Sequence, residues 1–165
     1  KLKAIIVPHA GYIYSGIVAG AGFKLLPPSL KLRRAGKSLK IIIIGPSHNS
    51  YFQGAGVDES DYWETPLGKV RCQMARQKLR HLGGRANVRK NEHSLEVQVP
   101  FLQRVLKGFE ILPIMTGEVD PESLANDLIS KIEKDYMLRC FSRTSPWMRY
   151  LLIPFQIAHF LFAQI

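Results

Sequence analysis

Three short motifs in this chain hold histidines beside groups that could take part in chemistry. His9 and His48 each follow an apolar run of residues, and His93 lies in the motif Glu-His-Ser-Leu-Glu at residues 92–96. A neutral imidazole is both a common metal ligand and a general base near neutral pH. If the fold brings the three motifs together, they predict a metal site or an acid–base site.

Each histidine also has an ordinary alternative interpretation. His9 could be a loop histidine that bonds a backbone carbonyl, and Glu92 and Glu96 could stabilise the first turn of a helix around His93. Alternatively, the positive end of that helix keeps His93 neutral as a base, which Glu92 or Glu96 orients. The signal at His48 is stronger, because the Gly-Pro-Ser before it fixes a sharp turn. Together, His9 and His48 favour a functional site.

Three hydroxyl residues flank these histidines. Tyr12 and Tyr14 come just after His9, and Ser47 directly precedes His48. The tyrosines could line a pocket with their rings and hydroxyls, or they could pack beside Trp63 as part of the core. Ser47 lacks the Gly-x-Ser-x-Gly context of a hydrolase nucleophile, so it is a weak nucleophile candidate and we assign it to the pocket lining.

The elements that must position these residues alternate between strands and helices. The predicted strands are Leu2–Val7, Lys40–Ile44 and Phe109–Ile114, and the predicted helices are Ser15–Leu26, Cys72–Leu82, Ser94–Leu106 and Pro121 to about Lys134. Continuously apolar strands are typical of a parallel sheet that is covered on both faces. We therefore predict an α/β fold with a mostly parallel central sheet and helices on both faces, whose ligands bind beyond the carboxyl ends of the strands.

Finer features of these elements are predicted from single residues. Ser15 and Ser94 are suitable N-caps for their helices, and Pro100 should kink the helix that contains it. The stretch Tyr51–Val70 is rich in Gly, Asp, Trp and Pro and predicts a loop with short strands.

Charge and composition restrict the partners of the chain. The 165 residues carry a formal charge of +10, but the cations are spread out, and their densest group, at residues 31–40, contains no aromatic residue to stack a base. We therefore expect a small-molecule or peptide ligand and no nucleic acid.

The 2 cysteines form no disulfide framework, which favours a cytoplasmic location. Tyr150–Ile165 is apolar but interrupted by polar residues and proline, so we expect no membrane span.

At the three histidine motifs the chain resembles the Memo-like family. The resembling segments are residues 6–12, 44–48 and 92–101, followed by the strand at 111–114, and the likeness extends over about Ala4 to Glu118. The resemblance implies a fold related to the class III extradiol ring-cleavage dioxygenases, which use non-haem Fe(II). It also implies links to phosphopeptide binding and to copper- or iron-dependent redox behaviour, as in the animal member.

The resemblance implies roles for individual residues of this chain. His9 and His48 match the two histidines of the family's metal pocket and would bind Fe(II) or Cu, and His93 matches the histidine beside the metal, in a base or supporting role. His9 and His48 alone are one ligand short of a triad of two histidines and one carboxylate, and Glu92 or Glu96 could supply the missing ligand. The implied function is that of a metal-dependent redox or oxygenase-like protein.

The last 30 residues depart from the family pattern. The family's later Asp/His motif and third metal ligand have no counterpart here before His159. We therefore predict a Memo-like α/β domain over residues 1–135 and a divergent apolar tail over 136–165, in a chain truncated at both ends. Two alternatives remain open: a non-catalytic binding module for an anionic peptide or metabolite, and an inactive fragment.

Overall fold

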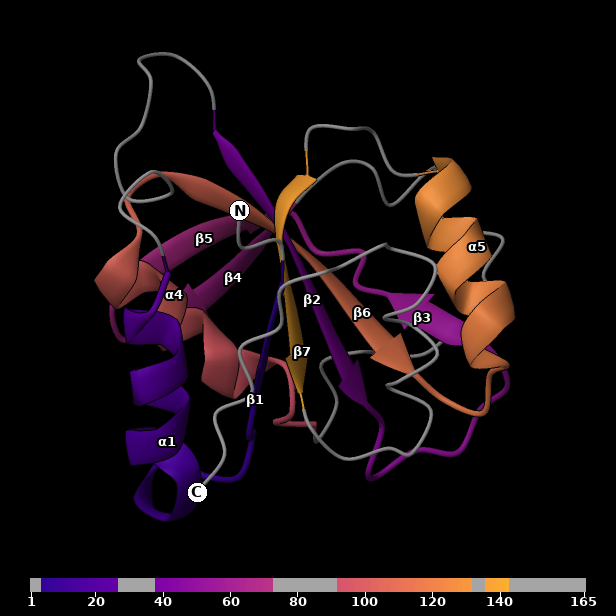
Figure 1. Cartoon of the computed structure of the whole chain (residues 1–165), viewed down its shortest axis with the longest axis horizontal. Coiled ribbons are helices and arrows are strands. Elements are labelled where there is room, and N and C mark those ends of the chain that lie inside the picture. The colour runs from indigo at the N-terminus through magenta and orange to yellow at the C-terminus, as the bar shows by residue number, and fades with distance from the viewer. Residues whose placement is uncertain (1–3, 27–37, 73–91, 132–135, 143–165) are drawn as a thin grey trace.

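A mostly parallel sheet forms the centre of the structure, a computed structural model that describes residues 4–26, 38–72, 92–131 and 136–142 (Figure 1). The described residues contribute seven strands in the order β1-β7-β2-β6-β5-β4, with β3 paired to β6. The strands are β1 Ala4–Val7, β2 Leu39–Pro46, β3 Ala55–Val57, β4 Tyr62–Thr65, β5 Gly68–Cys72, β6 Phe109–Thr116 and β7 Tyr136–Ser142. The pairs β1–β7, β7–β2, β2–β6 and β5–β6 are parallel, whereas β4–β5 and β3–β6 are antiparallel.

The helices lie on both sides of this sheet. They are α1 Tyr12–Lys24, the 3₁₀ helix η2 Glu96–Gln98, α4 Val99–Val105 and α5 Pro121–Lys131. Figure 1 shows α1 and α4 on one side and α5 on the other. The predicted α/β architecture with a mostly parallel sheet is confirmed. Among the helices of the described segments, none has the length and apolar character needed to cross a membrane.

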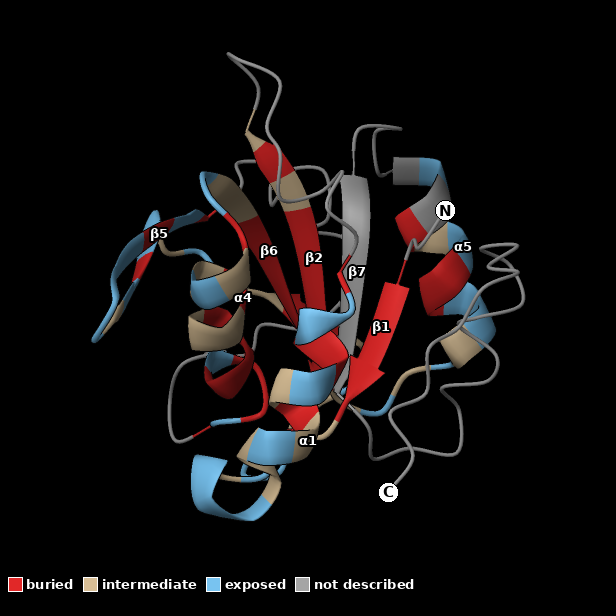
Figure 2. Ribbon diagram, turned by 60° about the vertical axis from the view of Figure 1, so that its left-hand side comes forward, coloured by how far each residue is buried: buried red, intermediate tan, exposed pale blue. Residues whose placement is uncertain are grey.

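The apolar run of β2 explains why both faces of the sheet are covered. Successive strand residues point to opposite faces, and Ile41 through Ile44 are all buried (Figure 2). Ile41 and Ile43 belong to a core cluster with Phe23 of α1 and Leu102 of α4. In that layer the rings of Phe23 and Phe101 stack with their centroids 5.2 Å apart.

Three details of the predicted elements are wrong. Helix α1 begins one turn earlier than predicted, at Tyr12, because the carbonyl of Gly11 already accepts helical hydrogen bonds. Ser15 is therefore not the N-cap of α1, and the Ser15 hydroxyl donates to the carbonyl of Ala10. The predicted helix Ser94–Leu106 is divided into η2 and α4, and Ser94 is the N-cap of neither. Pro100 lies in the first turn of α4 and not inside a longer helix, so its missing N–H leaves no helical hydrogen bond unmade.

Cys72 is the third correction: it ends β5, where it pairs with Ile111 and is buried in the core, instead of starting a helix. The rest of that predicted helix lies outside the described residues. The short strands expected within Tyr51–Val70 are present as β3, β4 and β5.

Strand β7 bears on the predicted domain boundary at residue 135. Residues 136–142 form β7, which lies between β1 and β2 and pairs with both. The remainder of the predicted tail, residues 143–165, lies outside the described residues, as does most of the basic group at 31–40. The backbone of Tyr136–Ser142 is therefore part of the sheet that positions the site.

Candidate functional site

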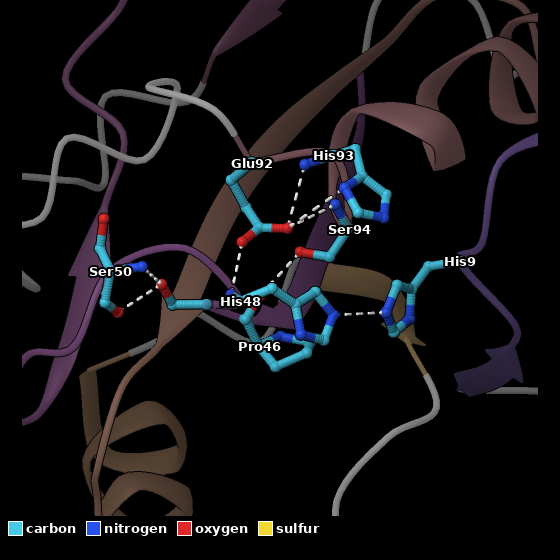
Figure 3. A network of polar contacts seen from close by, with 8 residues as sticks. His9, Pro46, His48, Ser50, Glu92, His93 and Ser94 are labelled. Atoms are coloured by element: carbon cyan, nitrogen blue, oxygen red, sulfur yellow. Dashed lines mark hydrogen bonds and ion pairs between the residues drawn. The ribbon is translucent and has the colours of Figure 1, made fainter.

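The three histidines of the sequence motifs meet at one edge of the sheet (Figure 3). His9 lies two residues beyond the end of β1, and His48 lies two residues beyond the end of β2. The Nε2 atoms of these two rings are 2.9 Å apart. The ring of His93, which precedes η2, has its centroid 5.9 Å from that of His48 and 6.2 Å from that of His9. The predicted convergence of the motifs is therefore present in the structure.

His9 is enclosed by the protein, whereas His48 and His93 are open to solvent. His9 is only 5% exposed, whereas His48 is exposed and the side chain of His93 is 48% exposed. Burial, together with the charges of His48 and His93, lowers the pKa of His9 to about 4, and Glu92 opposes this shift only weakly. His9 is thus neutral at physiological pH, the state in which an imidazole nitrogen can bind a metal or accept a proton.

Glu92 anchors the site through backbone hydrogen bonds. Its carboxylate accepts the backbone N–H of His48 at 2.6 Å and those of His93 and Ser94 at 3.0 Å. Burial raises the pKa of Glu92, but these hydrogen bonds outweigh burial and hold the pKa below its usual value. The nearest approach to the His93 ring is 3.9 Å, from Oε1 to Nδ1, which is too long for a hydrogen bond. Glu92 is therefore an ionised anchor for two loops.

The other predicted carboxylate and the tyrosines lie around α1 and η2. Glu96 is exposed in η2, and burial together with the charge of Glu96 raises the pKa of Tyr12. The ring of Tyr12 packs edge-on against Phe101, with the centroids 5.7 Å apart. Tyr14 is exposed. Trp63, the alternative packing partner considered for both tyrosines, is buried and donates its indole N–H to Asp58.

Ser47 shapes the loop that carries His48. Its hydroxyl donates to the carbonyl of Ser50 at 2.6 Å and accepts the backbone N–H of Ser50 at 3.2 Å. This pair of bonds closes a tight turn directly after β2, as a serine commonly does in loops. The hydroxyl is therefore used within the loop.

Sequence reasoning missed two residues that connect these loops. Ser94, predicted to be an N-cap, donates its hydroxyl to the carbonyl of Pro46 at 2.8 Å, and Gln98 donates its side-chain amide to the carbonyl of Pro8 at 3.3 Å. A polar residue between two apolar ones, as Gln98 is between Val97 and Val99, was the only signal in the sequence.

The separation of the two ring nitrogens fits the binding of one metal ion. Two nitrogens that each lie about 2.1 Å from an ion, at a right angle, are about 3 Å apart, close to the 2.9 Å between Nε2 of His9 and Nε2 of His48. The same distance fits a hydrogen bond between one protonated and one unprotonated Nε2. Within the described segments, no group of three or more His, Cys, Asp or Glu side chains is arranged to hold a metal. Among the described residues, the candidate metal donors at this edge of the sheet are the imidazoles of His9 and His48.

Comparison with known proteins matches this chain to one family. The family model described as "Memo-like protein" matches residues 1–142. MEMO1 family proteins of Thermotoga neapolitana, Aquifex aeolicus and Archaeoglobus fulgidus are 38%, 39% and 39% identical to it over 129, 127 and 131 residues. These alignments cover 75%, 74% and 73% of this chain but only 44%, 44% and 43% of the relatives. The chain thus spans less than half the length of these curated relatives.

Proposed function

This chain belongs to the Memo-like family, and on that premise we propose that it binds Fe(II) or Cu through His9 and His48 and acts as a metal-dependent redox or oxygenase-like protein. The observation that supports this function is the 2.9 Å separation of the two Nε2 atoms beyond the ends of β1 and β2. The low pKa of His9, about 4, supports it further, because the ring needs to lose no proton before it binds a metal.

A bound ion of this kind would supply one-electron redox chemistry, in line with the relation to class III extradiol dioxygenases that the motifs imply. The protein's part is to present the imidazoles of His9 and His48 and to leave further ligand positions for water and a substrate group. Glu92 stays a proposed third ligand, because each carboxylate oxygen has two lone pairs and carboxylates that bind metals are themselves hydrogen-bonded. Its hydrogen bond from the backbone N–H of His48 also fixes the loop that carries His48.

In this proposal His93 is the residue that moves a proton. Its ring faces those of His9 and His48 and is half exposed, so it can exchange protons with solvent. It would take a proton from a substrate group at the open side of the pocket. Glu96 stays a proposed partner that orients His93, and Tyr12, Tyr14 and Ser47 stay proposed lining residues of the pocket.

The metal content of the purified protein tests this proposal. We expect near-stoichiometric iron or copper after anaerobic purification or loading, measured by mass spectrometry. A His9→Ala/His48→Ala variant should contain almost none. His93→Ala is the matched control, which removes an imidazole from the same pocket and should keep the metal. A wild-type chain that stays metal-free after loading, or a double variant that retains its metal, would contradict the proposal.

The formal charge of +10 favours a second candidate, a non-catalytic module that binds an anionic peptide or metabolite at the same pocket. This function predicts binding that weakens with salt and survives EDTA. The metal-dependent function predicts that ligand binding is lost with EDTA and restored by Fe(II) or Cu. A chain that binds neither metal nor anion would be an inactive family member.

A further inference from the structure

The segment that carries His93 also contacts both of the other histidine loops. Glu92 accepts the backbone N–H of His48, and Ser94 donates to the carbonyl of Pro46. Four residues further on, Gln98 donates to the carbonyl of Pro8, directly before His9. Three side chains from residues 92–98 therefore hold the two loops whose rings meet.

The sheet alone does not bring these rings into contact. β1 and β2 are not neighbours, because β7 lies between them. Adjacent strands are about 4.8 Å apart, so strands separated by a third lie about 10 Å apart. The Nε2 atoms of His9 and His48 are nevertheless 2.9 Å apart. Two imidazole side chains can span this gap only when they point toward each other, so the loops beyond the strand ends must hold His9 and His48 in facing orientations.

Ser94 and Gln98 are suited to this task because they are rigidly held. Both are 0% exposed, and buried polar side chains of this kind keep their hydrogen bonds. Gln98 immediately precedes α4, whose residues Val99 and Leu102 are fully buried in the core. An amide fixed to a buried helix gives the Pro8 carbonyl a stationary partner.

We propose that Ser94 and Gln98 are positioning residues that set the separation of the His9 and His48 rings, Ser94 through Pro46 and Gln98 through Pro8. The purpose of this positioning, metal binding by His9 and His48, rests on the proposed function. The inference also assigns different tasks to the two residues, since Gln98 holds the loop of His9 and Ser94 holds the loop of His48.

Gln98→Met tests the inference, because it keeps the length of the side chain and removes its donor. The matched control is Gln103→Met on α4, where Gln103 also donates its amide to a backbone carbonyl, that of Gly68 at 3.0 Å. Two readouts are used on folded protein: nuclear Overhauser contacts between the rings of His9 and His48 without metal, and the affinity for Co(II) as a visible substitute for Fe(II).

We expect Gln98→Met to lose the ring contacts and to bind Co(II) about 10-fold more weakly than the wild type, the scale of effect typical of residues that support metal ligands. Gln103→Met should match the wild type in both readouts. Ser94→Ala removes only a hydroxyl and provides the second test, with the same expected losses, should Gln98→Met fail to fold.

Folded Gln98→Met and Ser94→Ala proteins that keep both the ring contacts and the wild-type affinity would overturn the inference. If the wild type does not bind Co(II) but the ring contacts still depend on Gln98 and Ser94, the positioning role is supported and the metal-binding function fails. The metal-free readout thus separates the two failures.

Discussion

Two carboxylates in this molecule accept several hydrogen bonds in very different surroundings. Glu92 is 8% exposed and accepts three backbone N–H groups at the histidine pocket. Glu118 is exposed beyond β6 and accepts the hydroxyl of Tyr51 and the side-chain amide of Gln53, the latter at 2.8 Å. In both residues the hydrogen bonds hold the pKa of the carboxyl below its usual value. For Glu92 the largest single cause is burial, which raises the pKa, but the hydrogen bonds together outweigh it.

The comparison shows that the same direction of pKa shift can accompany hydrogen bonds whose loss has very different costs. If the bonds to Glu118 break, water replaces them at little cost. If those to Glu92 break, backbone donors of two loops are left partly buried and without an acceptor, which is costly. The number of hydrogen bonds matters less than what would replace them.

Removing the buried carboxylate should have the largest effect. Glu92→Ala leaves three backbone N–H groups without their acceptor, and we expect the free energy of unfolding in urea to fall by about 3 kcal/mol. Glu118→Ala, the exposed counterpart, should leave the urea midpoint unchanged. Equal midpoints for the two variants would show that water enters the pocket freely.

Acid should weaken the pocket in the metal-free protein. The pKa of His9 is about 4 in the folded protein, against an ordinary value of 6.5. Between these pH values His9 is protonated in the unfolded chain but neutral in the folded one. The free energy of unfolding therefore decreases as the pH falls from 6.5 to 4. The pKa of Glu92 is also lowered, so its contribution is present above its unfolded value near 4.5 and is lost below it.

Urea unfolding at several pH values between 7.5 and 4 would measure this loss. His9→Asn should flatten the profile between pH 6.5 and 4, and His48→Ala should reduce the slope in part, because the charge of His48 contributes to the shift. Identical slopes for the wild type and His9→Asn would contradict the assignment.

The smallest effect is expected at the exposed cluster. Tyr51→Phe removes the hydroxyl that donates to Glu118, so the pKa of Glu118 should rise toward 4.5. Titration of the carboxyl carbon by NMR would detect this rise. The urea midpoint should not change, since the cluster is exposed; a clear destabilisation would show that the exposed network is coupled to the core.

Strands β1 and β2 were predictable because their apolar runs are local features of the sequence. The isoleucines of β2 and the apolar run of β1 can be buried only in a covered sheet, and both strands formed within two residues of their predicted bounds. Helix boundaries were less predictable. Pro100 is compatible with a kink or with a first turn, and only the packing of α4 on α1 selects between them. Cys72 was assigned to a helix because pairing of β5 with the distant β6 has no local signal.

The sequence by itself determined that His9 and His48 follow apolar strands and that His93 lies between two carboxylates, because strand ends and short motifs are local properties of the chain. The tertiary structure alone decided how these residues are used. It placed β7 between β1 and β2, turned Glu92 toward three backbone N–H groups, and buried Ser94 and Gln98 against two distant carbonyls. Contacts across 44 to 90 residues depend on which strands become neighbours, and that choice is made by the burial of the whole sheet.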